Sequence, residues 1–170
     1  MAFLDIAGIG KSFGKARILD GLDLRVEKGE FVVVFGPSGA GKTVLLRLIA
    51  GILQPEAGDI RIGGASILGQ GPEARDVGMA FQNFALYPHL PAFENIASPL
   101  RARRTGEAEI RKRVRDVAEL LRIGHVLDHL PKQLSNGQKQ RTALARSLVC
   151  SPSVLLLDDP LRNVDAKIRY

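Results

Sequence analysis

The sequence contains little cysteine, few aromatic residues and no long apolar run. The lone Cys150 excludes an internal disulfide, which suits a reducing compartment such as the cytosol. The longest stretch without Asp, Glu, Lys or Arg covers residues 77–93 and contains Pro88 and Pro91, so it falls short of the roughly 20 apolar residues that a membrane-spanning helix needs. Because Asp5 precedes any apolar segment, we expect no signal peptide. These absences predict a chain that does not itself cross a membrane.

The charge of the chain is unevenly distributed. Of the 170 residues, 25% are charged and 45% hydrophobic, as in ordinary globular domains. Residues 1–90 carry nine basic and nine acidic side chains, whereas residues 91–170 carry fifteen and nine. Much of the excess lies between Arg101 and Arg115, but no aromatic side chains interleave with it to stack on bases. A solvated helix face is therefore the favoured interpretation, and we expect no nucleic-acid partner.

Apolar runs predict the strands. Residues 31–35 (FVVVF) and 154–157 (VLLL) are continuous apolar runs, typical of parallel strands buried on both faces. Residues 27–30 are typical of a turn before the first run, and residues 58–62 and 77–81 indicate two further short strands.

Periodic apolar positions predict the helices. We expect helices over residues 42–50, stopped by Gly51, and over 136–150. A third, over 107–122, would have one apolar face made of Ile110, Val114, Val117, Ala118 and Leu121. Strands alternating with helices predict an α/β fold, with residues 91–134 as an inserted helical subdomain.

A glycine-rich segment between a predicted strand and a predicted helix is the strongest signal for chemistry. Its glycines allow backbone N–H groups to form an anion cradle, and the following helix N-terminus adds partial positive charge. A lysine can reach β- and γ-phosphates there, and a threonine hydroxyl can bind Mg²⁺. The segment consists of Gly36, Pro37, Ser38, Gly39, Ala40, Gly41, Lys42 and Thr43.

Two acidic residues follow the second apolar run. Asp158 stands at the end of the predicted strand, where a Walker B carboxylate holds Mg²⁺, and Asp159 stands where a general base could polarise water. Further upstream, Ser135 precedes Asn136, Gly137 and Gln138 and is a suitable N-cap for the helix that follows. A helix start of this kind is a second possible anion site.

Taken in order, these segments resemble the ATPases of ABC transporters. The shared pattern is the P-loop, Gln82 in a Phe-Gln-Asn segment, LSNGQ at residues 134–138, and LLLDDP at 155–160. The runs FQNFALYPHLPAFEN and DPLRNVDAKIR are most similar to the ATPase subunits of carbohydrate importers in the maltose and glycerol-phosphate importer group. This resemblance covers nearly the whole chain and implies a P-loop NTPase core with a parallel central sheet, an N-terminal antiparallel β portion and the helical subdomain.

The resemblance also implies roles for single residues. Phe13 would stack on adenine, and Gln82 would sense the γ-phosphate and bind Mg²⁺. Ser135, Gly137 and Gln138 would contact the ATP held by an opposing subunit, and Asp165 would lie at the interface between the two. ATP and Mg²⁺ would be the ligands. The partners would be a second ATPase subunit, identical or different, and transmembrane permease subunits at the cytoplasmic face of the plasma membrane.

The sequence departs from the family pattern at several positions. The catalytic Glu is replaced by the shorter Asp159, LSGGQ has become LSNGQ through Asn136, and Arg162 replaces a serine. Tyr170 ends the sequence before the family's switch histidine, so we expect a C-terminal part to be missing. Residues 1–90 and 135–170 would then form the core of a truncated ATPase domain.

Three functions stay open from the sequence. The chain is an ATP-hydrolysing importer subunit, a nucleotide-binding but hydrolysis-impaired partner subunit, or an ABC protein outside transport. The short segment between Gln82 and Ser135 disfavours the last, since it leaves no room for a coiled coil or zinc module. A GTPase is disfavoured because no Asn-Lys-x-Asp motif occurs.

Overall fold

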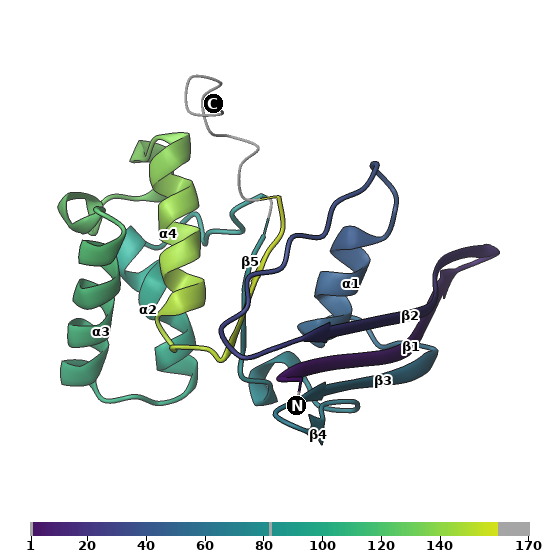
Figure 1. Cartoon of the computed structure of the whole chain (residues 1–170). Helices are drawn as coiled ribbons and strands as arrows, with labels where there is room; N and C mark the ends of the chain where they lie inside the picture. The colour runs from purple at the N-terminus through teal and green to yellow at the C-terminus, as the bar shows by residue number, and fades with distance from the viewer. Residues whose placement is uncertain (1, 82, 160–170) are drawn as a thin grey trace. The chain divides into compact units, whose positions relative to one another are not determined.

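The computed structural model describes residues 2–81 and 83–159. Within them the chain forms two compact units that divide between Asp76 and Val77. The first unit contains an antiparallel sheet and one helix, and the second contains three helices and a parallel strand pair (Figure 1). The predicted α/β class is therefore confirmed. None of the helices in the described ranges is both long and apolar enough to span a membrane.

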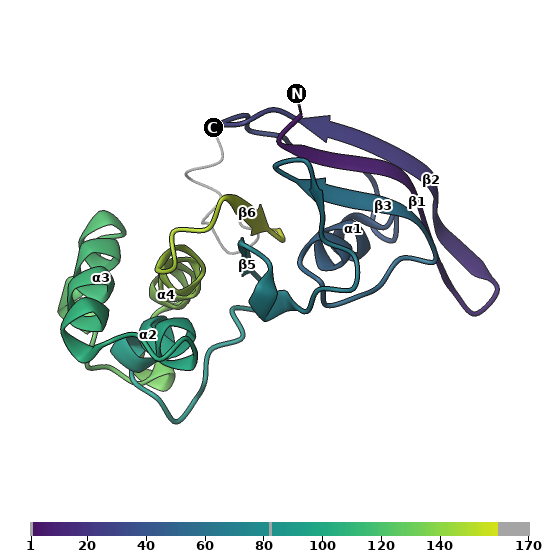
Figure 2. The same cartoon turned by 90° about the horizontal axis from the view of Figure 1, so that it is seen from below.

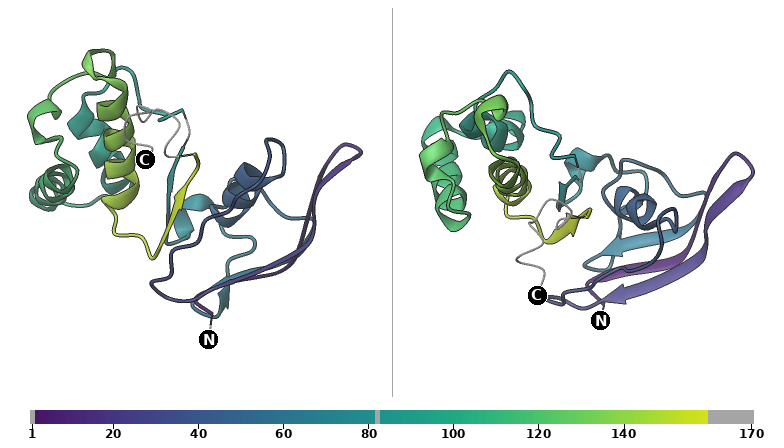
Figure 3. Two further views of the ribbon diagram at one scale, coloured as in Figure 1. Left: turned by 45° about the horizontal axis from the view of Figure 1, so that its top comes forward. Right: turned by 90° about the horizontal axis from the view of Figure 1, so that it is seen from above.

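The first unit is a twisted antiparallel sheet with one helix packed beside it. Its strands are β1 (Leu4–Phe13), β2 (Ala16–Val26), β3 (Ala57–Ile62) and β4 (Ala65–Ser66), in the order β2-β1-β3-β4. Helix α1 (Lys42–Ile49) lies beside this sheet in every view (Figure 3). Leu4 and Ile6 on β1 are buried on either side of half-exposed Asp5, as the period of two in a strand requires.

Arg75 closes the C-terminal end of α1 from inside this unit. Its side chain is 2% exposed, and Nη1 donates to the carbonyl oxygens of Leu48 at 2.7 Å and Ile49 at 2.8 Å. Nε donates to the Gln70 carbonyl oxygen at 3.1 Å. Burial lowers the pKa of this guanidinium, but a cation placed at the negative end of the helix dipole recovers part of that cost. Arg75 therefore fixes the end of α1 opposite the P-loop, a role that no sequence pattern indicated.

Gly58 is the position in the sheet with least room for a side chain. It has φ +88°, and a Cβ atom built there would lie 2.5 Å from the Ala7 carbonyl oxygen and from backbone atoms of Gly8. The pairing of β1 with β3 shifts register between Ala7 and Gly10, so β1 bulges toward Gly58. Only a residue without Cβ fits this approach of two backbones.

We expect Gly58→Ala to destabilise the protein strongly. The left-handed backbone alone costs roughly 1–3 kcal/mol for a non-glycine residue, and the contact with Ala7 adds to it. Chemical denaturation measures the change in the free energy of unfolding. Gly63→Ala is the matched control, because Gly63 also has positive φ, at +57°, but its Cβ would meet nothing within 4 Å. Equal losses in the two variants would contradict this assignment.

The second unit packs three helices around one apolar core. These are α2 (Ala92–Ala102), α3 (Glu107–Leu120) and α4 (Asn136–Leu148), which lie beside one another in Figure 2. Short 3₁₀ turns at Gly124–Val126 and Pro131–Gln133 join α3 to α4, and a third, Pro72–Ala74, lies in the first unit. The core includes the predicted apolar face of α3: Ile110, Val114, Val117 and Ala118 are buried, and Leu121 packs against them.

Strands β5 (Val77–Ala80) and β6 (Val154–Leu157) form the parallel pair of this unit. Val77 pairs with Val154 and Ala80 with Leu157, so both strands end at the same edge. The strand at 154–157 is confirmed, but its burial on both faces is not, since Leu155 is exposed while Leu156 is buried. Helix α4 enters β6 through a short connection, so the N-terminus of α4 and the C-terminal end of β6 lie at the same end of the unit (Figure 1).

The predicted buried strand at residues 31–35 is wrong for this structure. The segment follows the predicted turn, where the Glu30 N–H donates to the Glu27 carbonyl oxygen at 3.2 Å, but it forms no strand. Its side chains are exposed, with Phe31 at 84% and Phe35 at 97%. A parallel strand needs a neighbour for its backbone N–H and C=O groups, and the sheet of this unit is antiparallel and made of other residues. An apolar run indicates that a segment could form a buried strand. It does not indicate whether a neighbouring strand is present for that segment to pair with.

Candidate functional site

The P-loop lies between the extended 31–35 segment and α1. It is closed by Lys42, whose Nζ donates to the carbonyl oxygens of Gly36 and Pro37, each at 2.8 Å. The Ala40 N–H donates to the Pro37 carbonyl oxygen at 3.2 Å and completes a turn. The loop therefore curls around the lysine ammonium, which places one positive charge inside a glycine-rich bend.

Gly41 sets the direction in which α1 begins. It is the N-cap of the helix with φ +89°, and a Cβ atom there would come within 3.0 Å of both Ile18 and Leu19 side chains. Its carbonyl oxygen accepts the first helical hydrogen bond, from the Leu45 N–H at 2.9 Å. No side chain caps this terminus, so the N–H groups of the first turn and the helix dipole face the loop. This arrangement is suited to an anion with several oxygen atoms.

The other P-loop residues line the outside of the bend. Pro37, Ser38, Gly39 and Ala40 are exposed, and Gly36 and Thr43 are half-buried. Thr43 lies in the first turn of α1, directly after Lys42. The structure thus brings together, in one loop and one helical turn, all eight residues that the sequence assigned to the cradle.

Phe13 lies at the end of β1 in the same unit. Its ring is 48% exposed, so it is not part of the core. The Lys11 ammonium lies 5.6 Å from the ring centroid, which is a cation–π distance. The ring presents an accessible aromatic surface.

Ser135 and Gln138 form a capping box at the start of α4. The Ser135 hydroxyl accepts from the Gln138 N–H at 3.2 Å, and the Gln138 side-chain oxygen accepts from the Ser135 N–H at 2.8 Å. The predicted N-cap is therefore confirmed. Between them, Asn136 is exposed and Gly137 is half-buried. The box fixes the backbone of this helix start with two reciprocal bonds.

Asp158 and Asp159 follow β6 at the same end of the unit as the start of α4. Asp158 is buried, and its N–H donates to the Ala80 carbonyl oxygen at 3.1 Å, which extends the pairing of β5 and β6 by one residue. Asp159 is exposed and adopts φ +51°. The structure thus places a buried carboxylate at the carboxyl edge of the parallel pair, as the sequence predicted. Gln82, Arg162 and Asp165 lie outside the described residues.

The segment after β5, which we call the 84–91 loop, is held by two side chains that the sequence did not single out. Asn95 of α2 is fully buried: its Oδ1 accepts from the Tyr87 N–H at 2.7 Å, and its Nδ2 donates to the carbonyl oxygens of Tyr87, Leu90 and Pro91. Arg146 of α4 donates to the carbonyl oxygens of Phe84 at 3.1 Å and Ala85 at 2.8 Å. The loop is therefore fixed at both ends, while the Tyr87 ring stays 46% exposed.

The basic run between Arg101 and Arg115 lies on exposed helix surface, where much of it is neutralised. Arg101 contacts Glu94 at 2.6 Å and Glu107 at 3.0 Å, and Arg111 contacts Glu107 at 3.1 Å. Hydrogen bonds from Arg101 and then Arg111 lower the pKa of Glu107. These contacts agree with a solvated helix face.

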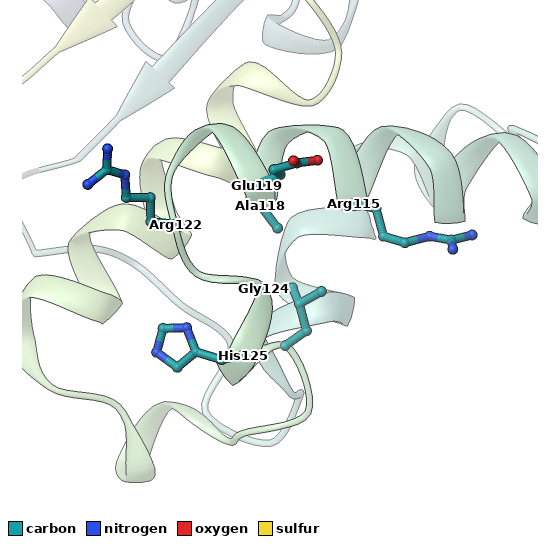
Figure 4. A pocket seen from close by; sticks show the side chains of 7 residues that line it. Arg115, Ala118, Glu119, Arg122, Gly124 and His125 are labelled. Carbon is teal, nitrogen blue, oxygen red and sulfur yellow. The ribbon is translucent and has the colours of Figure 1, made fainter.

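A recess at the end of α3 is lined in part by basic side chains. It is lined by Arg115, Ala118, Glu119, Arg122, Gly124, His125 and Leu127. Figure 4 shows Arg115 and Arg122 pointing in opposite directions, away from His125. Because these cationic groups do not converge, we assign the recess no ligand.

Known proteins match this chain over almost its whole length. It matches the ABC transporter family over residues 19–162. It is 48% identical to the sulfate/thiosulfate import ATP-binding protein of Rhodopseudomonas palustris, over 98% of this chain and 49% of that protein. It is 46% identical to the sn-glycerol-3-phosphate import ATP-binding protein of Cereibacter sphaeroides, over 99% of this chain and 48% of that protein. The chain thus spans about half the length of the curated relatives it matches.

A solved structure agrees with the sequence matches. A dimeric ATP-binding cassette in a post-hydrolysis state, bound to ADP and Pi, superposes with a TM-score of 0.85 at 31% identity, over 96% of this chain and 77% of that one. The P-loop, the capped start of α4 and the carboxylate after β6 are thus found on a fold that these proteins share. The chain belongs to the ABC transporter family.

Proposed function

We propose that this chain is the ATP-binding and ATP-hydrolysing part of an ABC importer. The observation that carries the proposal is the P-loop itself, in which Lys42 lies within a bend that opens α1. ATP bound there would replace the Gly36 and Pro37 carbonyl oxygens as the acceptors of the Lys42 ammonium. The first-turn N–H groups of α1 would donate to the phosphate oxygens.

The described residues fit a nucleotide with Mg²⁺. Gly41 opens α1 without a capping side chain, so the first-turn N–H groups stay available to a phosphate, and the Thr43 hydroxyl follows directly. Hydroxyl, carboxylate and amide oxygens are hard ligands that suit Mg²⁺, so we propose Thr43, Asp158 and Gln82 as its ligands. When bound, Mg²⁺ would neutralise charge that develops on the phosphates. The cradle would comprise Gly36, Pro37, Ser38, Gly39, Ala40, Gly41, Lys42 and Thr43.

We assign the chemical step to Asp159 and Gln82. An exposed carboxylate next to the buried Asp158 would orient and polarise the attacking water, and Gln82 would report the γ-phosphate. Phe13, with its accessible ring, would stack on the adenine. These roles follow from the family resemblance, and the exposure of Phe13 and Asp159 is compatible with them.

A second ATPase subunit would complete each site. Ser135, Gly137 and Gln138 would contact ATP held by the opposing subunit, and Asp165 would lie between the two. The capping box supports this role, because it holds the start of α4 in a fixed conformation with its N–H groups at an exposed end. Residues 91–134 would act as the helical subdomain, with 1–90 and 135–170 as the nucleotide-binding core.

The class of transported substrate is proposed from two segments of the sequence. The runs at residues 81–95 and 159–169 resemble those of carbohydrate importer subunits, so we propose carbohydrate uptake. The curated relatives differ in what their names say they import, sulfate in one case and glycerol phosphate in another, so uptake assays should compare these three classes. The comparisons give no support to the alternative of a hydrolysis-impaired partner subunit.

The membrane partner would bind the 84–91 loop. Tyr87 and Ala85 are exposed and Leu86 and Leu90 half-buried, so the loop offers an apolar surface on a fixed backbone. We expect a photoreactive group at Tyr87 to cross-link to a transmembrane permease subunit in the native membrane. The control places the same photoreactive group at Lys132, which is exposed but lies outside the 84–91 loop, and it should give no such product. Cross-links from position 87 to soluble proteins alone would contradict the importer assignment.

A further inference from the structure

Two residues of the 84–91 loop adopt a backbone conformation that side chains disfavour. Phe84 has φ +61° and Ala85 has φ +46°, although neither is glycine. Such a conformation persists only where surrounding contacts hold it. Two local bonds hold the turn, from the Phe84 N–H to the Phe81 carbonyl oxygen at 3.1 Å and from the Ala85 N–H to the Asn83 carbonyl oxygen at 2.7 Å. The long-range contact comes from Arg146 of α4, which is 62 residues away from Phe84 in sequence and donates to the carbonyl oxygens of both residues.

Arg146 makes a third contact with the loop. Its guanidinium carbon lies 5.6 Å from the centroid of the Tyr87 ring, a cation–π distance. Burial lowers the pKa of Arg146 and the neighbouring Tyr87 opposes that change. A planar guanidinium provides parallel donors and a face for stacking at once, which a lysine ammonium does not. The site is thus built for arginine.

Arg146 also belongs to the helix that begins at the capping box. It lies eleven positions after Ser135, which at the rise of an α-helix is about 16 Å along α4. Ala143 and Ala145 on α4 are buried, Ala145 in the helical core, and the Thr142 hydroxyl donates to the Gln138 carbonyl oxygen at 2.8 Å. A short helix packed in this way moves as one body. The 84–91 loop is therefore tied through one side chain to the helix that presents Ser135 and Gln138.

We propose that Arg146 is a positioning residue that couples occupancy of the 84–91 loop to the start of α4. A partner that shifts the Phe84–Ala85 turn displaces the two carbonyl oxygens to which Arg146 donates. The Arg146 guanidinium follows them, and α4 moves with it. The ATP-facing end of α4 then reports whether the loop is occupied. This inference rests on the proposed function, because it takes the loop as the membrane contact and α4 as the element facing ATP.

The test uses the protein in its native complex with the membrane subunits, reconstituted in vesicles, and compares Arg146→Met with Arg146→Lys. Arg115→Met is the matched control, because Arg115 is an exposed arginine on α3 whose Nε donates within its own helix, to the Arg111 carbonyl oxygen at 3.1 Å. Three quantities are measured in each: ATP affinity, ATP turnover without transported substrate, and the stimulation of turnover by that substrate.

For Arg146→Met we expect unchanged ATP affinity, basal turnover within about twofold, and stimulation reduced about tenfold, within the range of mutational effects on coupling. Arg146→Lys should restore part of the stimulation, and Arg115→Met should behave as the wild type. Full stimulation in Arg146→Met would overturn the inference. So would a parallel loss of affinity, basal turnover and stimulation, which would show a purely structural role. If the wild type binds ATP but substrate never stimulates it, the proposed function fails instead.

Discussion

Replacing Lys42 with alanine is expected to weaken ATP binding by about 10- to 100-fold. The ammonium is the one cationic side chain within the P-loop bend, where it would make a charge-assisted bond to the phosphates. Bonds of this kind contribute roughly 1.5–3 kcal/mol, which corresponds to that range of affinities. Equilibrium titration with ATP in the presence of Mg²⁺ measures the change.

Two controls separate phosphate binding from folding. Lys28→Ala removes an exposed lysine from the turn before the 31–35 segment and should leave the affinity unchanged. Lys42→Ala also removes two bonds to loop carbonyl oxygens, so its free energy of unfolding is measured alongside. Unchanged ATP affinity in a folded Lys42→Ala protein would rule out this loop as the nucleotide site.

Replacing Asp158 with asparagine is expected to lower ATP turnover by about 10²–10³-fold while ATP still binds. Its carboxylate is buried at the end of β6, where the backbone bond to Ala80 fixes its position. Asparagine keeps the shape but removes the negative charge that attracts Mg²⁺ most strongly to this position, and loss of metal-assisted charge stabilisation costs several kcal/mol. The binding of ATP should also lose most of its dependence on Mg²⁺.

The measurement is a pair of ATP titrations, with and without Mg²⁺, together with steady-state phosphate release from the protein in its native complex. Asp20→Asn is the control, since it changes an exposed carboxylate that pairs with Arg17 on β2. If Asp158→Asn keeps both the turnover and the Mg²⁺ dependence of the wild type, Asp158 is not the metal ligand.

Local patterns in the sequence were enough for the parts of the site that depend on neighbours in the chain. A P-loop, a capping box and an acidic residue after a strand are each defined within a few residues. The structure accordingly places Lys42 in its loop, Ser135 with Gln138, and Asp158 after β6 as predicted. The apolar face of α3 was predictable for the same reason, because a period of 3.6 residues is a local property.

The parts that sequence reasoning missed depend on contacts between distant residues. From the sequence, Arg75 and Arg146 are expected to be surface charges. In the structure each donates to backbone carbonyl oxygens far away in sequence, 26 and 27 residues for Arg75 and 61 and 62 residues for Arg146. No local sequence pattern specifies which distant carbonyl oxygen an arginine will contact. The 31–35 segment shows the same limit for a strand, since its apolar side chains say nothing of which backbone would pair with it.

The most direct test of the central claim is an equilibrium titration of the purified protein with ATP, repeated without Mg²⁺ and in competition with ADP. The proposed site predicts saturable binding at one site per chain, strengthened by Mg²⁺ and displaced by ADP. A folded protein that shows no saturable ATP binding would contradict the claim.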